Sequence, residues 1–506
     1  MERIAMIVLI IAYFVVVLGI GAWASRKVKT AEDYVVAGRS LGFWVFVMLM
    51  VASCTSGMTL LGVAGLGYTG GWPTIWEQIF VPLTLAICII FYGTKLNRIS
   101  KREKYLTIQD YFSHRFYSPR AMRAISTIAV LITCVIYLTG QYRAISLVLT
   151  RLLGITHLQA LLIAAIIVMA YVVLGGLYAV AWTTLIQGLI LIIGVLCTAP
   201  FVISFAGGLT HINEALGKID PNYLKLAFPQ QHPPYAPYAF CTPAFLVSFF
   251  FLLALGLGSA PHIINNVLTV KKKNFFKWAP LTAFAIYVII MYLIKVVGFA
   301  TRVMVTEGVF QISHPDYSFI TSVEHIMPPL AWAFFAVVIM AAVMSTTDRL
   351  LLTIGSSVGW DLYKKLINPQ ASDKKVTFVS RISVVVFAVF TVLLAIRPPA
   401  LLAWLIWMGI GIMLSCFVAP LLFGLYWKGA TREGGIWGML SGLISSVIFG
   451  AVHKFVTPLP MHFSFYSFVI SVVVLVAVSL FTKKPSDKVL QGTETGFYIK
   501  TKAIRQ

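Results

Sequence analysis

The sequence predicts an all-helical integral membrane protein with about 13 transmembrane helices. Of its 506 residues, 59% are hydrophobic and only 11% are charged, whereas a soluble domain carries about 25% charged residues. Its apolar segments are about 20 residues long, which is the length that a helix needs to cross a hydrocarbon core. Because lipid offers the backbone no hydrogen-bond partners, each of these segments is expected to be helical.

The expected spans form one transmembrane domain over residues 1–482, followed by a polar tail, 483–506, that is expected to be disordered. The longest connection between two spans is about 207–240, which leaves no room for a soluble enzyme domain. The spans are expected near residues 4–25, 43–69, 73–94, 124–152, 157–176, 180–206, 241–266, 279–301, 329–357, 377–396, 400–427, 434–456 and 463–482.

The net charge of +22 is explained by topology rather than by binding to nucleic acid. Lysine and arginine are concentrated in alternate connections, and basic connections stay on the cytoplasmic side of a cell membrane. The alternation therefore predicts an external N-terminus and a cytoplasmic C-terminus. The basic segments are 26–39, 95–123, 271–277, 364–381, 428–432 and the tail from 483 onward.

The sequence shows none of the signs of an enzyme. The six cysteines lie within or at the ends of apolar spans, without the spacing of metal ligands or of a disulfide framework. Neither a nucleophile–base pair nor a metal cluster is evident, and no cofactor is expected.

Small residues interrupt the spans at 43–69 and 241–266, which are the second and the seventh. An offset of five spans gives two segments of opposite orientation, so 43–206 and 241–427 are predicted to be inverted five-helix repeats. Paired broken helices in inverted repeats are typical of a transporter's central site. The alternative is that the glycines only allow close helix packing. The interrupting residues are Gly57, Gly62, Gly65, Gly67, Gly256, Gly258 and Pro261.

Three motifs extend this interpretation: AEDYVVAGRSLG at 31–42, AYVVLGGLYAVAWTTLIQG at 170–188 and IMAAVMSTTDRLLLTIGSSVGWDLY at 339–363. Together they resemble the sodium:solute symporter family, whose members have the leucine-transporter-type fold, and the resemblance extends over about residues 5–482. PHIINN at 261–266 and GLYWKGATREGG at 424–435 look closest to its sodium/pantothenate permease branch.

The resemblance implies a sodium site between the second and ninth spans, with no other metal. Sodium needs several oxygen ligands, and a broken helix frees backbone carbonyls that a regular helix has already paired. The alternative is that the hydroxyls of the ninth span only bond back to their own helix. The implied ligands are the carbonyls of Ala52, Thr55 and Ala342 and the hydroxyls of Ser345 and Thr346.

The substrate site is expected between the broken helices and the third span. Trp76 has an alternative role as an interfacial aromatic residue, and Glu77 an alternative role in lining a water-filled vestibule. The candidate residues are Ser56, Gly57, Thr59, Trp76, Glu77 and Asn265, with Gln141 and Asn266 as further polar candidates.

Charged residues inside spans are costly and are therefore weighed separately. Asp348 lies one turn beyond Ser345, and either belongs to an ion path or pairs with Arg143 or Lys295. Many family members carry a second-site aspartate where this chain has Thr184. The sequence therefore predicts one sodium ion per substrate.

The predicted function is sodium-coupled import of a small organic solute by alternating access. A carboxylate such as pantothenate or a monocarboxylate is the expected substrate, and a proline-like amino acid is the alternative. A rival hypothesis is a transporter-like membrane sensor. The expected partners are the solute, sodium and the lipid bilayer.

Overall fold

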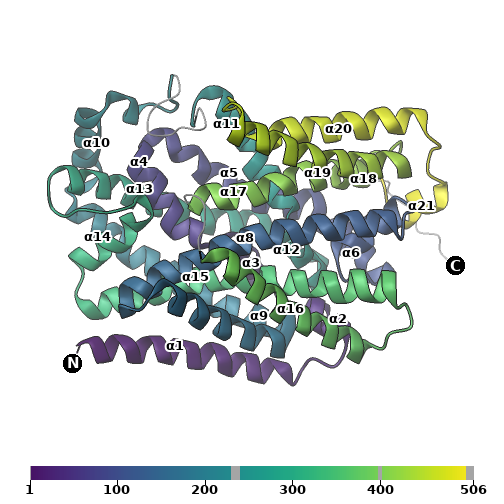
Figure 1. Cartoon of the computed structure of the whole chain (residues 1–506), viewed down its shortest axis with the longest axis horizontal. Coiled ribbons are helices and arrows are strands. Elements are labelled where there is room, and N and C mark those ends of the chain that lie inside the picture. Colours follow the sequence, from purple (N-terminus) through teal and green to yellow (C-terminus); the bar gives the residue numbers. More distant parts are fainter. Residues whose placement is uncertain (1, 230–239, 397–401, 497–506) are drawn as a thin grey trace.

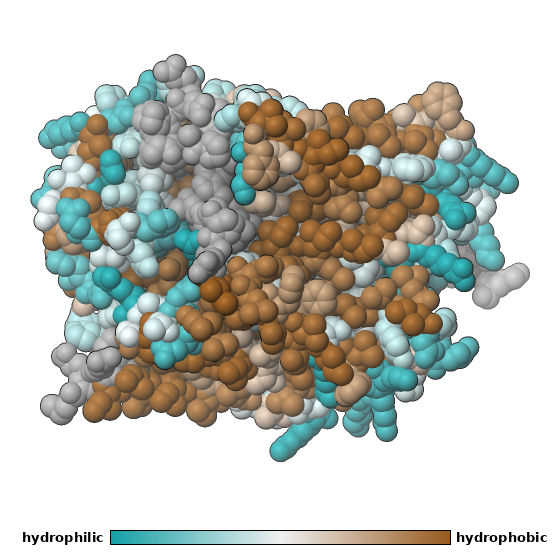
Figure 2. Space-filling view, in the orientation of Figure 1, coloured by the Kyte–Doolittle hydropathy of each residue, from teal (hydrophilic) through white to brown (hydrophobic). Residues whose placement is uncertain are grey.

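The computed structural model describes residues 2–229, 240–396 and 402–496. In these residues the chain is helical, and the single β-bridge joins Leu41 to Val270. The long helices run side by side along the longest axis of the molecule (Figure 1). Helix α1 begins at one end of this bundle, and the last helix, α21, lies at the other end (Figure 1). Figure 2 shows a broad apolar belt between two ends that carry the hydrophilic residues, as expected of a multi-pass membrane protein.

The helices are separated by short connections. Their bounds are α1 Glu2–Ser25, α2 Ala31–Val36, α3 Phe43–Cys54, α4 Val63–Gly70, α5 Glu77–Ile87, α6 Thr94–Glu103, α7 Ile108–Arg115, α8 Ala121–Leu153, α9 His157–Phe205, α10 Gly208–Ile219, α11 Pro243–Phe250, α12 Pro261–Ile264, α13 Ala279–Thr306, α14 Ser318–Ile326, α15 Pro329–Ser356, α16 Asp373–Ala395, α17 Leu402–Met413, α18 Ala419–Tyr426, α19 Arg432–Phe455, α20 Phe463–Phe481 and α21 Asp487–Gly492.

Ten helices in the described residues are long and apolar enough to cross a membrane, or up to twelve when each of two bent pairs counts as one span. This count differs from the predicted thirteen, because the expected spans 157–176 and 180–206 fall in the single element α9. The two parts of α9 meet at Gly176, whose φ of +50° is not helical. A Cβ there would lie 2.5 Å from the ring of Tyr34, so only glycine fits this turn.

Both predicted helix breaks are present. Helix α3 and the helical segment Met58–Gly70 meet at an angle of 61°, and Pro243–Ser259 and Pro261–Thr269 meet at 50°. Thr55 leaves α3 in an extended conformation. At the second break, Pro261 restricts the preceding Ala260 to an extended conformation, which ends the first half of the helix.

The C-terminal tail differs from the expected disorder as far as Gly496. Helix α21 is followed by a segment that packs on the ends of α6 and α18. Gly496 donates its N–H to the carbonyl of Leu425 at 3.0 Å. Glu494 forms ion pairs with Arg98 and Arg102 of α6. The prediction failed because these contacts are tertiary and leave no periodic signal in a short polar segment. Residues 497–506 of the predicted tail lie outside the described residues.

Candidate functional site

Helix α15 passes the break of α3, and its hydroxyl groups face the freed carbonyls. Ser345 Oγ donates to the carbonyl of Ala52 at 3.1 Å, and to that of Ala342 at 2.8 Å. Thr346 Oγ1 donates to the carbonyls of Ala52 at 3.1 Å and Thr55 at 2.7 Å. These side chains and backbone segments are buried. The two hydroxyls therefore lie within hydrogen-bond distance of the three predicted carbonyl oxygens, and the five predicted oxygens are neighbours.

The alternative interpretation, bonding back to the same helix, describes only part of this arrangement. Ser345 makes such a bond to Ala342, but it also reaches α3, and both recorded bonds of Thr346 cross to α3. Five uncharged oxygens on two separate helices are a suitable donor set for a hard monovalent cation. A cation at this point would take the lone pairs that the hydroxyl protons now occupy.

Around the break, polar side chains from other helices form hydrogen bonds with backbone groups of the broken helix. Gln141 Oε1, on α8, accepts the N–H of Gly57 at 2.9 Å. Tyr287, on α13, donates to the carbonyl of Cys54 at 2.8 Å, and its hydroxyl lies 3.1 Å from Thr59 Oγ1. Tyr287 was not predicted as a site residue, because its only signal in the sequence is a tyrosine inside an apolar span.

A small cavity lies beside this break, with room for about one water molecule. Ser56, Thr59 and Glu77, three of the predicted substrate residues, line it, together with the hydroxyls of Tyr137 and Tyr287. The remaining wall is mostly apolar and includes Met58, Val63, Leu253, Leu257, Met291 and Ile410. A solute larger than water therefore does not fit in the cavity in this structure.

The structure does not bring the other predicted substrate residues to this cavity. Trp76 Nε1 donates to the carbonyl of Leu226 at 2.7 Å, and its ring stacks on Phe80 in a separate apolar groove. Asn265 Oδ1 accepts the N–H of Ile108 at 2.9 Å, at the start of α7. Gly57 is in the break, but its Cα faces Ala144, where a Cβ would lie 2.2 Å from that residue's Cβ.

Glu77 and Lys295 form a buried ion pair between α5 and α13. Glu77 Oε2 lies 3.1 Å from Lys295 Nζ, and the side chains are 1% and 0% exposed. The other oxygen of Glu77, Oε1, accepts no hydrogen bond from the residues that the structure describes. Lys295 therefore pairs with Glu77, which removes it as one of the two candidate partners of Asp348.

Asp348 instead lies in a polar cluster formed by α1, α9 and α15. Tyr171 donates its hydroxyl to Asp348 Oδ2 at 3.0 Å. Gln187 Nε2 donates to the hydroxyl of Tyr13 at 3.2 Å. Thr184, one turn before Gln187, is buried, and its hydroxyl has no hydrogen-bond partner within the described part of the chain. Sequence patterns did not predict this cluster, because its members come from three separate helices.

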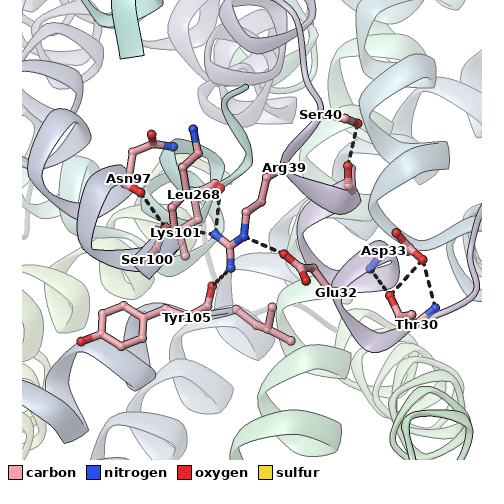
Figure 3. Close-up of polar contacts among 12 residues, drawn as sticks. Thr30, Glu32, Asp33, Arg39, Ser40, Asn97, Ser100, Lys101, Tyr105 and Leu268 are labelled. Atoms are coloured by element: carbon pink, nitrogen blue, oxygen red, sulfur yellow. Dashed lines mark hydrogen bonds and ion pairs between the residues drawn. The ribbon is translucent and has the colours of Figure 1, made fainter. Parts of the chain in front are cut away.

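The motif at 31–42 builds a second polar centre at the α6 and α21 end of the bundle, where Arg39 joins four segments (Figure 3). Its guanidinium donates to Glu32 at 2.7 Å and to Ser100 of α6 at 3.1 Å. It also donates to the carbonyls of Tyr105 at 2.6 Å and Leu268 at 3.3 Å. Leu268 lies near the end of the second broken helix, in its half Pro261–Thr269, so Arg39 connects that helix to α6 at this end.

The fold and the paired broken helices define a secondary transporter. The chain belongs to the sodium:solute symporter family, whose model matches residues 34–442. It is therefore a sodium-coupled symporter and not an enzyme, and the family resemblance seen in the sequence is confirmed.

Two relatives illustrate the range of solutes. The chain is 26% identical over 491 residues to the osmoregulated proline transporter OpuE of Bacillus subtilis, covering 94% of each chain. It is also 26% identical over 439 residues to the sodium/pantothenate symporter of Escherichia coli, covering 86% of this chain and 88% of the relative. Equal identity to transporters of different solutes leaves the substrate open.

A solved structure confirms the fold. A Na⁺-coupled sialic acid symporter in a substrate-bound outward-open state superposes with a TM-score of 0.79 at 18% identity, covering 96% of this chain and 99% of the other. The nucleobase-cation-symport-1 family transporter Mhp1 in a closed conformation superposes with a TM-score of 0.54 at 12% identity. The predicted leucine-transporter-type fold is thereby established.

Proposed function

We propose that one sodium ion binds between α3 and α15 and drives the import of a small carboxylate, such as pantothenate or a monocarboxylate. The observation that carries this proposal is the convergence of the Ser345 and Thr346 hydroxyls on the carbonyls of Ala52 and Thr55. The ion would hold the two helices together, and Cys54 and Ser56, on either side of Thr55, line the cavity. Bound sodium would thus keep the substrate-binding shape of the break.

The cycle follows from this linkage. External sodium favours the outward-open state with the substrate site formed, and release of sodium into the cytoplasm loosens the contact and lets the solute leave. A sodium ion that enters with a monoanionic carboxylate moves no net charge, so its concentration gradient drives the accumulation. With a neutral solute, each sodium ion that moves inward across 100 mV would add about 2.3 kcal/mol. The alternation of basic connections supports an external N-terminus and a cytoplasmic C-terminus, and the opposite placement of α1 and α21 in the bundle agrees with it (Figure 1).

A proline-like amino acid is the second candidate substrate, favoured by the similarity to OpuE. The test is uptake of labelled pantothenate, short monocarboxylates and proline into proteoliposomes under an imposed sodium gradient. We expect accumulation of a carboxylate that disappears when potassium replaces sodium. Sodium-driven accumulation of proline alone would replace the carboxylate proposal with the second candidate. Accumulation that is indifferent to sodium would refute the role of the α3–α15 site.

A further inference from the structure

Glu77 is the one carboxylate among the described residues that line the cavity, and only one of its two oxygens has a partner. Its Oε2 lies 3.1 Å from Lys295 Nζ, whereas its Oε1 has no donor within the described part of the chain. Buried carboxylate oxygens are normally hydrogen-bonded. A buried acceptor without a donor, at the wall of a cavity, indicates that a ligand supplies the donor.

The charge of the site indicates what kind of donor this is. Glu77 and Lys295 cancel each other, and the cavity lining contains no lysine, arginine or histidine among the described residues. The proposed sodium site includes the carbonyl of Thr55, and the neighbouring residue Cys54 lines the cavity. The positive charge of a sodium ion would therefore be balanced by the negative charge of a substrate carboxylate. An additional ammonium group would leave one uncompensated positive charge in a buried site, which is strongly unfavourable.

We propose that the substrate is a small carboxylate that also carries a neutral hydrogen-bond donor, a hydroxyl or an amide N–H, and that this donor binds Glu77 Oε1. This inference rests on the proposed function, and it narrows the substrate class. Lys295 is a positioning residue, because its Nζ lies 3.1 Å from Glu77 Oε2 and fixes that oxygen. Simple alkanoates and amino acids that bind through an ammonium group are excluded as preferred substrates.

The site should therefore bind a carboxylate that carries a hydrogen-bond donor more tightly than the same carboxylate without it. A hydrogen bond to a charged group changes binding by about 10- to 100-fold. A site built to bind a hydroxyl also discriminates strongly against the analogue that lacks it, because the carboxylate is then left unpaired.

The experiment compares matched acids in proteoliposomes that contain the wild-type protein. Pantothenate, lactate and glycerate supply a hydroxyl, propionate is lactate without it, and alanine replaces the hydroxyl of lactate by an ammonium group. Each acid competes with the labelled carboxylate that the sodium-driven uptake panel identifies. We expect at least one hydroxy acid to compete about 10-fold or more better than propionate. Equal competition by lactate, glycerate, pantothenate and propionate would overturn the inference, and so would preferential competition by alanine.

Variants test whether Glu77 is the cause. The double variant Glu77→Gln/Lys295→Met removes both charges and leaves no unpaired buried ion, so the fold is expected to survive. Its preference for the hydroxy acid over propionate should fall about 10-fold. Glu324→Gln is the matched control, because Glu324 pairs with Arg151 in a partly exposed ion pair. A retained preference in the double variant would overturn the inference.

The two proposals fail differently. If the proposed function is wrong, the wild-type protein shows no sodium-driven uptake of a carboxylate. If only the present inference is wrong, sodium-driven uptake of a carboxylate persists but does not depend on a hydroxyl or amide donor. The wild-type comparison decides the question even when a variant does not fold.

Discussion

Removing the two hydroxyls of α15 should weaken sodium binding far more than folding. Ser345→Ala removes one donor to the carbonyl of Ala52, and Thr346→Ala removes a second donor to Ala52 together with the donor to Thr55. Each change also deletes one of the five oxygens proposed to bind the ion. Both replacements put a smaller, apolar side chain at a buried position of α15. The helix is therefore expected to remain in place.

The size of the effect can be worked out from the ligand count. Loss of one neutral ligand from a buried ion should weaken binding by about 1.4 kcal/mol, which is tenfold in the half-maximal sodium concentration. The double variant should shift it further than either single variant, by up to about 100-fold, because two neighbouring hydroxyls that share the carbonyl of Ala52 need not contribute additively. Thr346→Ala should also cost about 1 kcal/mol of stability, because it removes donors to two buried carbonyls.

The assay is initial uptake as a function of sodium, with choline as the replacement cation and thermal unfolding in detergent measured in parallel. Thr347→Ala is the matched control, because the hydroxyl of Thr347 bonds to Val343 within α15 at 2.7 Å. Unchanged sodium dependence in the folded double variant would refute the site. Loss of folded protein in both single variants, with normal Thr347→Ala, would instead support a structural role.

Three further predictions concern topology, stoichiometry and the Arg39 centre. A cysteine introduced in the segment 207–229 should be labelled from outside intact cells, whereas one after Lys483 should not; external labelling of the tail would invert the topology. Because Thr184 offers no carboxylate, one sodium per substrate is expected, so uptake of a monoanion into proteoliposomes should follow the sodium gradient but hardly respond to membrane potential; a reversal potential that gives a ratio of two would direct attention to Asp348→Asn. Arg39→Lys keeps the charge but not the four-way geometry, and should lower the rate of uptake several-fold at similar half-maximal sodium. An unchanged rate would show that the Arg39 centre does not limit the cycle.

The helix breaks and the oxygen set could be predicted because their causes are local. Pro261 favours a break because proline lacks a backbone N–H and disfavours a helical conformation at the residue before it. The small residues around Gly57 weaken the helix in which they lie. The positions of Ser345 and Thr346 follow from helical spacing once the family motif is seen. Their meeting with Ala52 then needs only that the second and ninth spans be neighbours.

The pairing of Glu77 could not be predicted in the same way. Its partner, Lys295, is 218 residues away on α13, and which charged residue faces which depends on how α5 and α13 pack. The place of α13 depends in turn on its other neighbours: at Gly298 of α13, a Cβ would lie 2.1 Å from the carbonyl oxygen of Ala64 on α4. Asn265 illustrates the same limit, because a polar residue in a broken helix can serve the backbone of α7 rather than a ligand.

The contact of the C-terminal segment with α6 has a consequence for biosynthesis. Lys95, near the start of α6, is 8% exposed, and its ammonium donates to the carbonyls of Leu425, Glu494 and Gly496. Two of these acceptors, Glu494 and Gly496, lie 399 and 401 residues after Lys95 in the sequence. The ammonium of Lys95 therefore reaches its full set of described acceptors only after synthesis has passed Gly496. A chain truncated before Ser486 would keep one of the three acceptors, so this end of α6 should be less stable than in the full chain.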